Sequence, residues 1–327
     1  MNIRNYDKNS VQFIEVTNNS KLKVTFANLG ASIFSVVFNG YIMTKNVKDI
    51  KDMFQPQIYH GRTIGRFSNR MRGHKFKIDN EVYELEPNEG DNVLHGGKKS
   101  LAYTLFEQNV RSDDSYIYVT YFKEIKDMGD GFPGNLRLEV KYYVSLYTDE
   151  IKVEYRAYSD KDTVLSMTNH SYFNLGCRSI NGLTLQINAD KFLSVDPETL
   201  LPVRPTEVDE VMDFREPKRI NKHLFDQSLQ SNRLNGYDHY YYLNNKDINV
   251  KALSLSNAKF ILDIYTDFEG IQIYTSGFDP KVNLYPECEW LYNSVAIEPS
   301  DSFEKLHLLK KDNVYKRTIK YLFNVKE

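Results

Sequence analysis

The chain has 327 residues, of which 41% are hydrophobic and 26% are charged, an ordinary composition for a globular protein. Its 42 Lys and Arg nearly balance 44 Asp and Glu, so the net charge is −2 and no basic face favours nucleic acid. The two cysteines, Cys177 and Cys288, stand far apart in no metal-ligand spacing, which argues against a disulfide scaffold and a zinc site.

No membrane-spanning or secretory segment is expected. No apolar run approaches the roughly 20 residues that a transmembrane helix needs. Residues 1–7 lack the apolar stretch of a secretory signal. We therefore expect a cytoplasmic protein that forms one domain over residues 1–327 and has neither a membrane nor a nucleic acid as partner.

Strictly alternating apolar and polar residues recur along the chain and predict β-strands. The first such segment, residues 22–26, stops at Gly30. Residues 76–78 and 82–85 flank a polar turn and predict a hairpin, and residues 117–121 alternate again.

The clearest strand is residues 136–146, where every second residue is apolar, a spacing that a helix could not use on one face. The pattern resumes at residues 151–157, which predicts an antiparallel hairpin. Residues 260–264 are expected to pair with residues 271–275 in a second hairpin. A last alternating segment covers residues 315–323.

Helical signals are few and short. Asp301 followed by Glu304 has the spacing of a helix N-terminus and predicts one short helix before residues 306–309. Residues 216–225 are expected to form a turn or two of helix. The architecture is thus predicted to be all-β, with large antiparallel sheets packed as a sandwich.

Long polar connections between the predicted strands contain or adjoin most of the motif-like residues. They cover residues 39–60, 86–104, 123–135 and 202–236. Unstructured connections of this length are uncommon in compact domains unless they are functional. We therefore expect these loops to surround a site.

The densest polar motif is residues 168–176, Thr-Asn-His-Ser-Tyr-Phe-Asn-Leu-Gly. An interior strand does not need several amides, an imidazole and a hydroxyl in close succession, because each buried polar group requires a partner. The run is either a well-satisfied structural element or a site. Taken singly, a histidine such as His170 is more often structural than catalytic.

Two further motifs precede this run. The segment 61–70 ends in Asn69-Arg70, which could donate hydrogen bonds to ligand oxygens or form an ordinary surface pair. In residues 92–97, paired glycines follow His95 and permit a sharp turn and a close approach to the imidazole. The Gly/Pro-bounded residues 130–134 indicate a turn rather than a site.

Candidate polar residues also occur in the C-terminal half. Asp238 adjoins a histidine, Gln272 lies in a predicted strand, and Glu298 follows an apolar run and precedes Pro299. A carboxylate serves as a base and an imidazole as an acid near neutral pH, while amide and guanidinium groups bind hydroxyls. The residues alone indicate acid–base chemistry on a polyhydroxylated ligand.

Taken in order, these motifs resemble the galactose mutarotase (aldose 1-epimerase) family. The resemblance extends from about residue 20 to the C-terminus and rests on a series of short motifs. They are Gly65 with Asn69-Arg70, Leu94-His95-Gly96-Gly97, residues 131–134, residues 169–175, Tyr237-Asp238-His239, Gln272-Ile273-Tyr274-Thr275 and Glu298-Pro299.

The resemblance implies a β-supersandwich fold with few short helices. It also implies interconversion of the α and β anomers of an aldohexose, such as galactose or glucose, without any cofactor or metal. Carried over to this chain, Glu298 would be the base and His170 the acid, while His95 would hydrogen-bond the sugar and steady charge at the ring oxygen. The other implied site residues are the hydroxyl-binding Asn69, Arg70, Asp238 and Gln272, with Tyr172 lining the pocket.

Neighbouring residues are assigned supporting roles. We expect Arg66 to be structural. Asn169, Ser171 and Asn174 are expected to form the scaffold that positions His170 rather than to contact the ligand.

The chain departs from the family pattern at the pocket rim. Residues 98–103 replace the usual continuation after Leu-His-Gly-Gly, Phe106 stands where a Trp is common, and Ser300 replaces the Gln after Glu-Pro. These departures leave the preferred sugar open. The sequence also leaves open whether the protein forms a homodimer.

Two alternatives are kept. The first is a relative that acts on a hexose phosphate, for which Lys98-Lys99 would supply charge, or on a disaccharide. The second is a non-catalytic sugar-binding protein on the same scaffold. Retention of both His170 and Glu298 argues against the second, because a pure binder needs no matched acid and base.

Overall fold

The first of two large antiparallel sheets is built from strands in both halves of the chain. The computed structural model describes residues 2–278 and 281–326, and its strands form a nine-stranded sheet, a second nine-stranded sheet and a five-stranded sheet. The strands of the first sheet, in spatial order, are β12 (Glu107–Ser112), β13 (Tyr116–Ile125), β14 (Leu136–Ser145), β15 (Glu150–Ser159), β29 (Val314–Val325), β24 (Phe260–Thr266), β23 (Lys251–Ser256), β18 (Thr184–Ile187) and β21 (Lys218–Arg219).

The second sheet carries most of the motif residues. Its path is β20 (Pro202–Glu207), β19 (Lys191–Val195), β22 (Asp238–Tyr242), β25 (Gly270–Tyr274), β27 (Val295–Ser300), β17 (Thr168–Phe173), β6 (Thr44–Val47) and β26 (Leu284–Tyr285), with β7 (Arg62–Ile64) paired to β17. All its pairings are antiparallel.

The remaining strands form the five-stranded sheet and three short ribbons. The five-stranded sheet runs in chain order through β1 (Asn2–Lys8), β2 (Val11–Thr17), β3 (Leu22–Ala27), β4 (Ser32–Phe38) and β5 (Tyr41–Ile42). The ribbons are β9 (Lys75–Ile78) with β10 (Glu81–Glu84), β8 (Arg70–Met71) with β11 (Val93–Leu94), and β16 (Thr163–Val164) with β28 (Leu308–Leu309).

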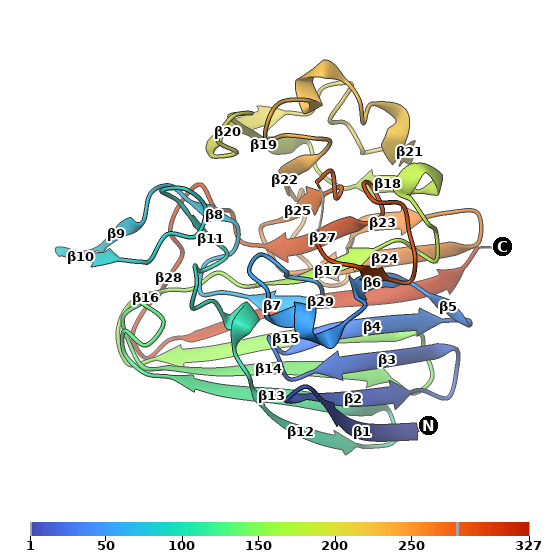
Figure 1. Ribbon diagram of the computed structural model, residues 1–327, viewed down its shortest axis with the longest axis horizontal. Coiled ribbons are helices and arrows are strands. Elements are labelled where there is room, and N and C mark those ends of the chain that lie inside the picture. The colour runs from blue at the N-terminus through green and yellow to red at the C-terminus, as the bar shows by residue number, and fades with distance from the viewer. Residues whose placement is uncertain (1, 279–280, 327) are drawn as a thin grey trace.

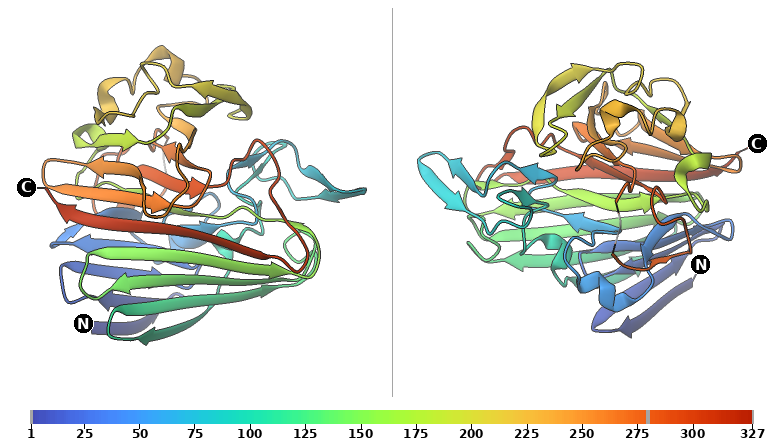
Figure 2. Two further views of the ribbon diagram at one scale, coloured as in Figure 1. Left: turned by 180° about the vertical axis from the view of Figure 1, so that it is seen from behind. Right: turned by 45° about the horizontal axis from the view of Figure 1, so that its top comes forward.

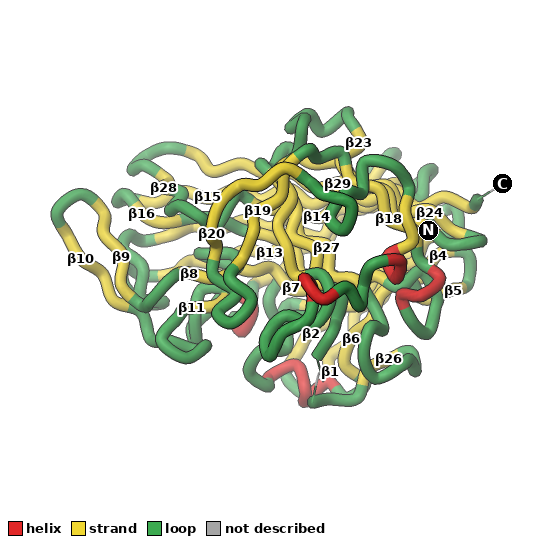
Figure 3. Tube along the Cα trace, turned by 90° about the horizontal axis from the view of Figure 1, so that it is seen from above, coloured by secondary structure: helices red, strands yellow, loops and turns green. Residues whose placement is uncertain are grey.

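Helical structure within the described residues is confined to short 3₁₀ turns (Figure 3). They are η1 (Ile50–Phe54), η2 (Leu101–Tyr103), η3 (Ile180–Gly182), η4 (Ile220–Lys222) and η5 (Gln227–Leu229). The prediction of an all-β fold with few short helices is therefore confirmed, and η4 lies in the predicted helical region 216–225. None of the helices found in the described residues has the length and hydrophobicity to cross a membrane.

The main core lies between the sheets. Phe26 of β3 packs against Tyr142 of β14 with ring centroids 4.7 Å apart, which joins the five-stranded sheet to the first large sheet. Phe173 of β17 packs against Tyr321 of β29 at 5.6 Å, which joins the second large sheet to the first. The five-stranded sheet thus covers one part of the first sheet and the second large sheet another (Figures 1 and 2).

The alternation in the sequence is realised most clearly in β14. Leu136, Leu138, Val140, Tyr142 and Val144 are buried, while the residues between them are partly or fully exposed. This strand pairs with β15, and β9 pairs with β10, so both of these predicted hairpins are confirmed. Period-two hydrophobicity therefore identified the strands that have one face toward the core.

The predicted hairpin of residues 260–264 with 271–275 is wrong. Strand β24 pairs with β23 and β29 in the first sheet, whereas β25 pairs with β22 and β27 in the second. The connection between them carries the fully buried Phe268 from one sheet to the other. Alternation shows which face of a strand is buried but says nothing about which strand lies beside it.

The predicted short helix beginning at Asp301 is also wrong. The Asp301 carboxylate accepts hydrogen bonds from Nε and Nη2 of Arg317 at 3.1 and 2.9 Å, so it does not cap a helix. The backbone N–H of Glu304 donates instead to Oγ of Ser302 in a local turn at 3.4 Å. The chain then forms β28 rather than a helix because Leu308 and Leu309 pair with β16.

Candidate active site

One cavity brings together every site residue predicted from the sequence. Its volume is about 470 Å³. The predicted residues that line it are Asn69, Arg70, His95, His170, Tyr172, Asp238, Gln272 and Glu298. They come from β8 and the residue before it, from the residue after β11, and from β17, β22, β25 and β27, so segments far apart in the sequence meet here.

The register of the second sheet places three of these side chains in one row. Gln272 of β25 is paired with Glu298 of β27. On the other side of β27, Ser171 is paired with Ile297, so the next step along both strands brings His170 opposite Glu298. Cross-strand neighbours of this kind have Cβ atoms about 5 Å apart on the same face. Sheet register therefore sets the geometry of the row Gln272–Glu298–His170.

His170 and Glu298 form a close buried pair. Nε2 of His170 lies 3.2 Å from Oε1 of Glu298, and both side chains are almost inaccessible to solvent. Burial lowers the pKa of His170 to about 3. Burial, reinforced by the nearby Asp238 carboxylate, raises the pKa of Glu298 well above its ordinary value. Burial therefore favours the uncharged form of each group, a protonated Glu298 beside a neutral His170.

A tight backbone arrangement fixes the second imidazole. Asn69 and His95 both have positive φ, at 63° and 54°. The backbone N–H of Asn69 donates to Nδ1 of His95 at 3.1 Å, so the proton of the neutral imidazole is on Nε2. A Cβ at Gly96 would lie 2.3 Å from the carbonyl oxygen of Gly65, which explains why a glycine follows His95.

The His95 and His170 rings are in edge-to-face contact, with centroids 5.1 Å apart. Burial, with a further contribution from His170, lowers the pKa of His95 well below its ordinary value. A neutral His95 with its proton on Nε2 can donate one hydrogen bond to a ligand oxygen.

A carboxylate and an amide from neighbouring strands form a polar wall of the cavity. Nε2 of Gln272 donates to Oδ1 of Asp238 at 2.6 Å. Oδ2 of Asp238 lies 3.6 Å from Nη1 of Arg70. Oε1 of Gln272 is buried and has no hydrogen-bond partner among the residues that the structure describes, so it is an acceptor without a donor in the cavity wall.

The other wall is aromatic and contains two residues that the sequence interpretation missed. Tyr59 stacks on His170 with centroids 5.6 Å apart, His170 stacks on Tyr172 at 4.9 Å, and Tyr172 stacks on His60 at 4.1 Å. Tyr59 and His60 line the cavity. Both lie at the end of the long connection 39–60, directly before the motif that begins at Gly61. Their position beside this motif was the one signal in the sequence that pointed to them.

The residues expected to support His170 act on its strand rather than on its ring. Nδ2 of Asn169 donates to the carbonyl oxygen of Gly61 at 2.9 Å, and Oγ of Ser171 donates to Oδ1 of Asn169. Asn174 instead holds the turn after β17 through the carbonyl oxygen of Cys177. These bonds satisfy the polar groups of a fully buried strand and leave the His170 side chain toward the cavity.

Arg66 has a structural position away from the cavity. Its guanidinium is fully buried, forms an ion pair with Asp130 at 2.8 Å, and donates to the carbonyl oxygens of Pro133 and Gly134 at 2.9 and 3.3 Å. The segment 130–134 is thus a turn whose carboxylate and carbonyl oxygens bind the guanidinium of Arg66.

Three donor atoms of the site are close enough to suit a small cation. One ligand atom each from His95, His170 and Glu298 lie within 4.8 Å of one another. The same proximity is what an acid–base site requires. Our expectation from the sequence, that no metal takes part, stays a prediction.

The fold and cavity together define an all-β sandwich protein with a buried histidine–glutamate pair and further polar groups around one pocket. Residues 12–322 match the family model described as Aldose 1-epimerase, and the chain belongs to the aldose 1-epimerase family.

Known relatives cover most of the chain. A galactose mutarotase of Sus scrofa is 34% identical over 238 residues, which is 70% of this chain and 66% of that protein's length. An aldose 1-epimerase of Escherichia coli is 31% identical over 307 residues, covering 87% of this chain and 85% of that protein.

Solved structures with a similar fold cover nearly the whole chain. A galactose 1-epimerase from Lactobacillus acidophilus superposes with a TM-score of 0.87 and 28% identity, covering 100% of this chain and 99% of that chain. An aldose epimerase homologue from C. elegans gives a TM-score of 0.85 and 26% identity, covering 96% and 99%.

Proposed function

We propose that this protein is an aldose 1-epimerase that interconverts the α and β anomers of an aldohexose, such as galactose or glucose, without a cofactor. The observation that carries the proposal is the buried His170–Glu298 pair, 3.2 Å apart in the wall of a polar cavity. Membership of the aldose 1-epimerase family and the galactose activity named for its relatives support it.

The reaction begins when the proton of the pair moves from Glu298 to His170. The Glu298 carboxylate then accepts the proton of the C1 hydroxyl, the bond between C1 and the ring oxygen breaks, and the His170 imidazolium protonates that oxygen. Rotation about C1–C2 and closure with the roles reversed give the other anomer. The pair holds one proton before and after each step, so no external acid or base is consumed.

The other residues bind and orient the sugar. His95 donates from Nε2 to the ring oxygen and stabilises charge that develops there. Arg70, Asp238 and Gln272 hold the hydroxyls, Asn69 orients His95 through its backbone N–H, and Tyr172 packs beside the ring of His170.

The test is a direct measurement of anomer exchange. Purified protein is added to freshly dissolved α-galactose or α-glucose, and the approach to the anomeric equilibrium is followed by polarimetry and by ¹H NMR. We expect acceleration in proportion to enzyme concentration. Sugar binding by saturation transfer without any exchange between anomers would instead identify a non-catalytic binder.

A phosphate-specific relative has less support. Lys98 forms an ion pair with Glu86, and the described lining of the cavity includes neither Lys98 nor Lys99. We therefore expect free hexoses to be better substrates than glucose 6-phosphate, and the same assay with xylose, arabinose and maltose ranks the remaining sugars. A cytoplasmic location and the option of a homodimer stay predictions.

A further inference from the structure

The guanidinium of Arg70 is held along one edge by a residue that the reaction scheme does not include. Nε and Nη2 of Arg70 donate to the two carboxylate oxygens of Glu89 at 2.9 and 3.2 Å. Both side chains are largely buried, with 12% and 11% of their surfaces exposed. A two-pronged contact of this kind fixes the plane of the guanidinium as well as its position.

The orientation set by Glu89 determines what Arg70 can offer to a ligand. With the Nε edge occupied, the remaining N–H groups are the second one of Nη2 and the two of Nη1, and Nη1 lies 3.6 Å from Oδ2 of Asp238. Arg70, Asp238 and Glu89 all line the cavity. A bound hydroxyl can therefore be clamped between the free end of the guanidinium and the Asp238 carboxylate.

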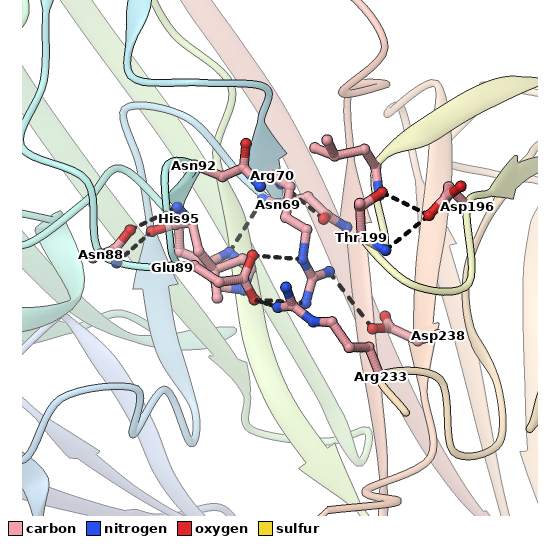
Figure 4. A network of polar contacts seen from close by, with 12 residues as sticks. Asn69, Arg70, Asn88, Glu89, Asn92, His95, Asp196, Thr199, Arg233 and Asp238 are labelled. Atoms are coloured by element: carbon pink, nitrogen blue, oxygen red, sulfur yellow. Dashed lines mark hydrogen bonds and ion pairs between the residues drawn. The ribbon is translucent and has the colours of Figure 1, made fainter. Parts of the chain in front are cut away.

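Glu89 has a second cationic partner from a different part of the chain. Nη2 of Arg233 lies 3.0 Å from Oε1 of Glu89, and 38% of the Arg233 side chain is exposed. The turn that carries Arg233 precedes β22, whereas Glu89 belongs to the loop before β11. The result is a row of alternating charges, Arg233, Glu89, Arg70 and Asp238, which extends to the sugar site (Figure 4).

The loop that carries Glu89 is itself fixed. Asn88 accepts a hydrogen bond from the backbone N–H of Leu94 at 2.7 Å and donates to its carbonyl oxygen at 3.0 Å. These bonds tie the position of Glu89 to the residue directly before His95. The contacts of Glu89 are therefore part of an ordered wall rather than of a free surface loop.

We propose that Glu89 is a positioning residue for anomer exchange, which acts through Arg70, and that Arg233 sets how much of the Glu89 charge is available to Arg70. This inference rests on the proposed epimerase function. Glu89 holds the sugar-binding guanidinium in place and offsets its positive charge close to Glu298.

The charge effect has a predictable direction. Arg70 lowers the pKa of Glu298 and Asp238 raises it. When the negative charge of Glu89 is removed, the positive charge of Arg70 is no longer offset, so the pKa of Glu298 falls. When the positive charge of Arg233 is removed, the negative charge of Glu89 is no longer offset, so the pKa of Glu298 rises. Neither substitution alters the other titratable groups that surround Glu298. These groups are His170 and Tyr172 of β17, His95 after β11, Asp238 of β22 and Tyr321 of β29.

The experiment compares two variants that each remove one charge, and Glu89→Gln does so with little change in shape. Anomer exchange of galactose is measured as a function of pH and of sugar concentration for wild type, Glu89→Gln and Arg233→Gln. In Glu89→Gln we expect the KM to rise about tenfold, because Arg70 loses a charged partner. The profile of kcat/KM against pH should move to lower pH by at least ~0.5 unit in Glu89→Gln and toward higher pH in Arg233→Gln.

A surface arginine with two acidic partners serves as the matched control. Arg215 contacts Asp190 at 3.2 Å and Asp213 at 2.8 Å, and we expect Arg215→Gln to leave KM and the pH profile unchanged. Glu89→Asp should restore part of the affinity lost in Glu89→Gln, since it restores the charge. Thermal melting of each variant separates a folding defect from a positioning effect.

The outcomes divide cleanly. Shifts of opposite sign in the two variants, with the control unmoved, support the inference. If the wild type is active and Glu89→Gln has the same KM and pH profile as the wild type, the inference is wrong and the proposed function stands. A wild-type protein that does not exchange anomers of any aldose overturns the proposed function itself.

Discussion

His170 and Glu298 face each other across two neighbouring antiparallel strands, with Nε2 of the imidazole 3.2 Å from Oε1 of the carboxylate. Positions 170 and 298 are 128 residues apart in sequence. Sheet pairing brings them together because Ser171 and Ile297, the next residues on each strand, are register partners. A one-residue slip of either strand would turn one of these side chains to the opposite face of the sheet.

Removing either member of this pair should abolish most of the activity. Because a positioned acid or base contributes roughly 10²–10⁴-fold, His170→Asn and Glu298→Gln should each lower kcat by about that factor in polarimetric assays. The pair His223 and Glu210, 3.9 Å apart and outside the described cavity lining, provides the control, and His223→Asn with Glu210→Gln should be fully active. Full activity in both His170→Asn and Glu298→Gln would contradict the assignment.

The pH dependence of catalysis should follow the single proton held by the pair. The pKa of His170 is lowered to about 3, so a second proton binds only in strong acid, and the raised pKa of Glu298 sets the alkaline limb. We therefore expect kcat/KM to persist below pH 6, where an ordinary histidine would be protonated, and to fall on the alkaline side as the shared proton is lost. Loss of activity with a midpoint near pH 6.5 would show that His170 titrates as an exposed histidine.

Asp238 should affect both sugar affinity and the ionisation of Glu298. In Asp238→Asn the hydroxyl clamp loses its charge, and we expect the KM for galactose to rise about tenfold. Because Asp238 raises the pKa of Glu298, the same variant should move the alkaline limb to lower pH. Michaelis–Menten analysis across pH measures both effects; an unchanged KM would place Asp238 outside the sugar site.

Acid should destabilise the folded protein through its buried histidines. Burial lowers the pKa of His60 to about 3 and that of His239 to about 4. The unfolded chain therefore binds protons below pH 6.5 that the folded chain does not, so stability falls as pH decreases from 6.5 toward these values. Each such histidine contributes a slope of up to ~1.4 kcal/mol per pH unit.

The variant His60→Phe should reduce this slope, since it keeps a ring against Tyr172 but removes one titrating group. Urea unfolding at several values between pH 7 and pH 4 gives the slope for wild type and variant. Equal slopes would mean that His60 takes up its proton in the folded state as easily as in the unfolded one.

Catalysis should not depend on a bound metal. Wild-type protein dialysed against a strong chelator is expected to keep its full rate, and elemental analysis should find no stoichiometric zinc, manganese or iron. Since His95, His170 and Glu298 have donor atoms within 4.8 Å of one another, added Zn²⁺ should instead inhibit by occupying the proton-transfer groups. Loss of activity on chelation that is restored by a metal would refute this expectation.

Several structural features followed from the sequence because their cause is local. The alternation in β14 and β15, and the polar turn between β9 and β10, depend on neighbouring residues, and these hairpins were predicted correctly. Eight of the residues that line the cavity were also found in the sequence, since amides, imidazoles and carboxylates stand out within otherwise regular strands.

Other features depend on residues distant in sequence, and these were missed or predicted wrongly. Strands β24 and β25 follow each other but belong to different sheets, because β29 and β27 supply their partners. The helix predicted at Asp301 does not form because the guanidinium of Arg317, which is distant in sequence, binds the Asp301 carboxylate. Glu89 gave no signal in its loop, since its importance comes from the two arginines around it.

The sequence by itself determined an all-β chain and the chemical groups available for acid–base work on a sugar. The tertiary structure decided which of these groups meet, in what order along the sheet, and in what state of ionisation. The physical reason is that strand pattern and residue chemistry are local properties. Sheet register, burial and the pairing of charges arise only when strands such as β17 and β27 pack side by side.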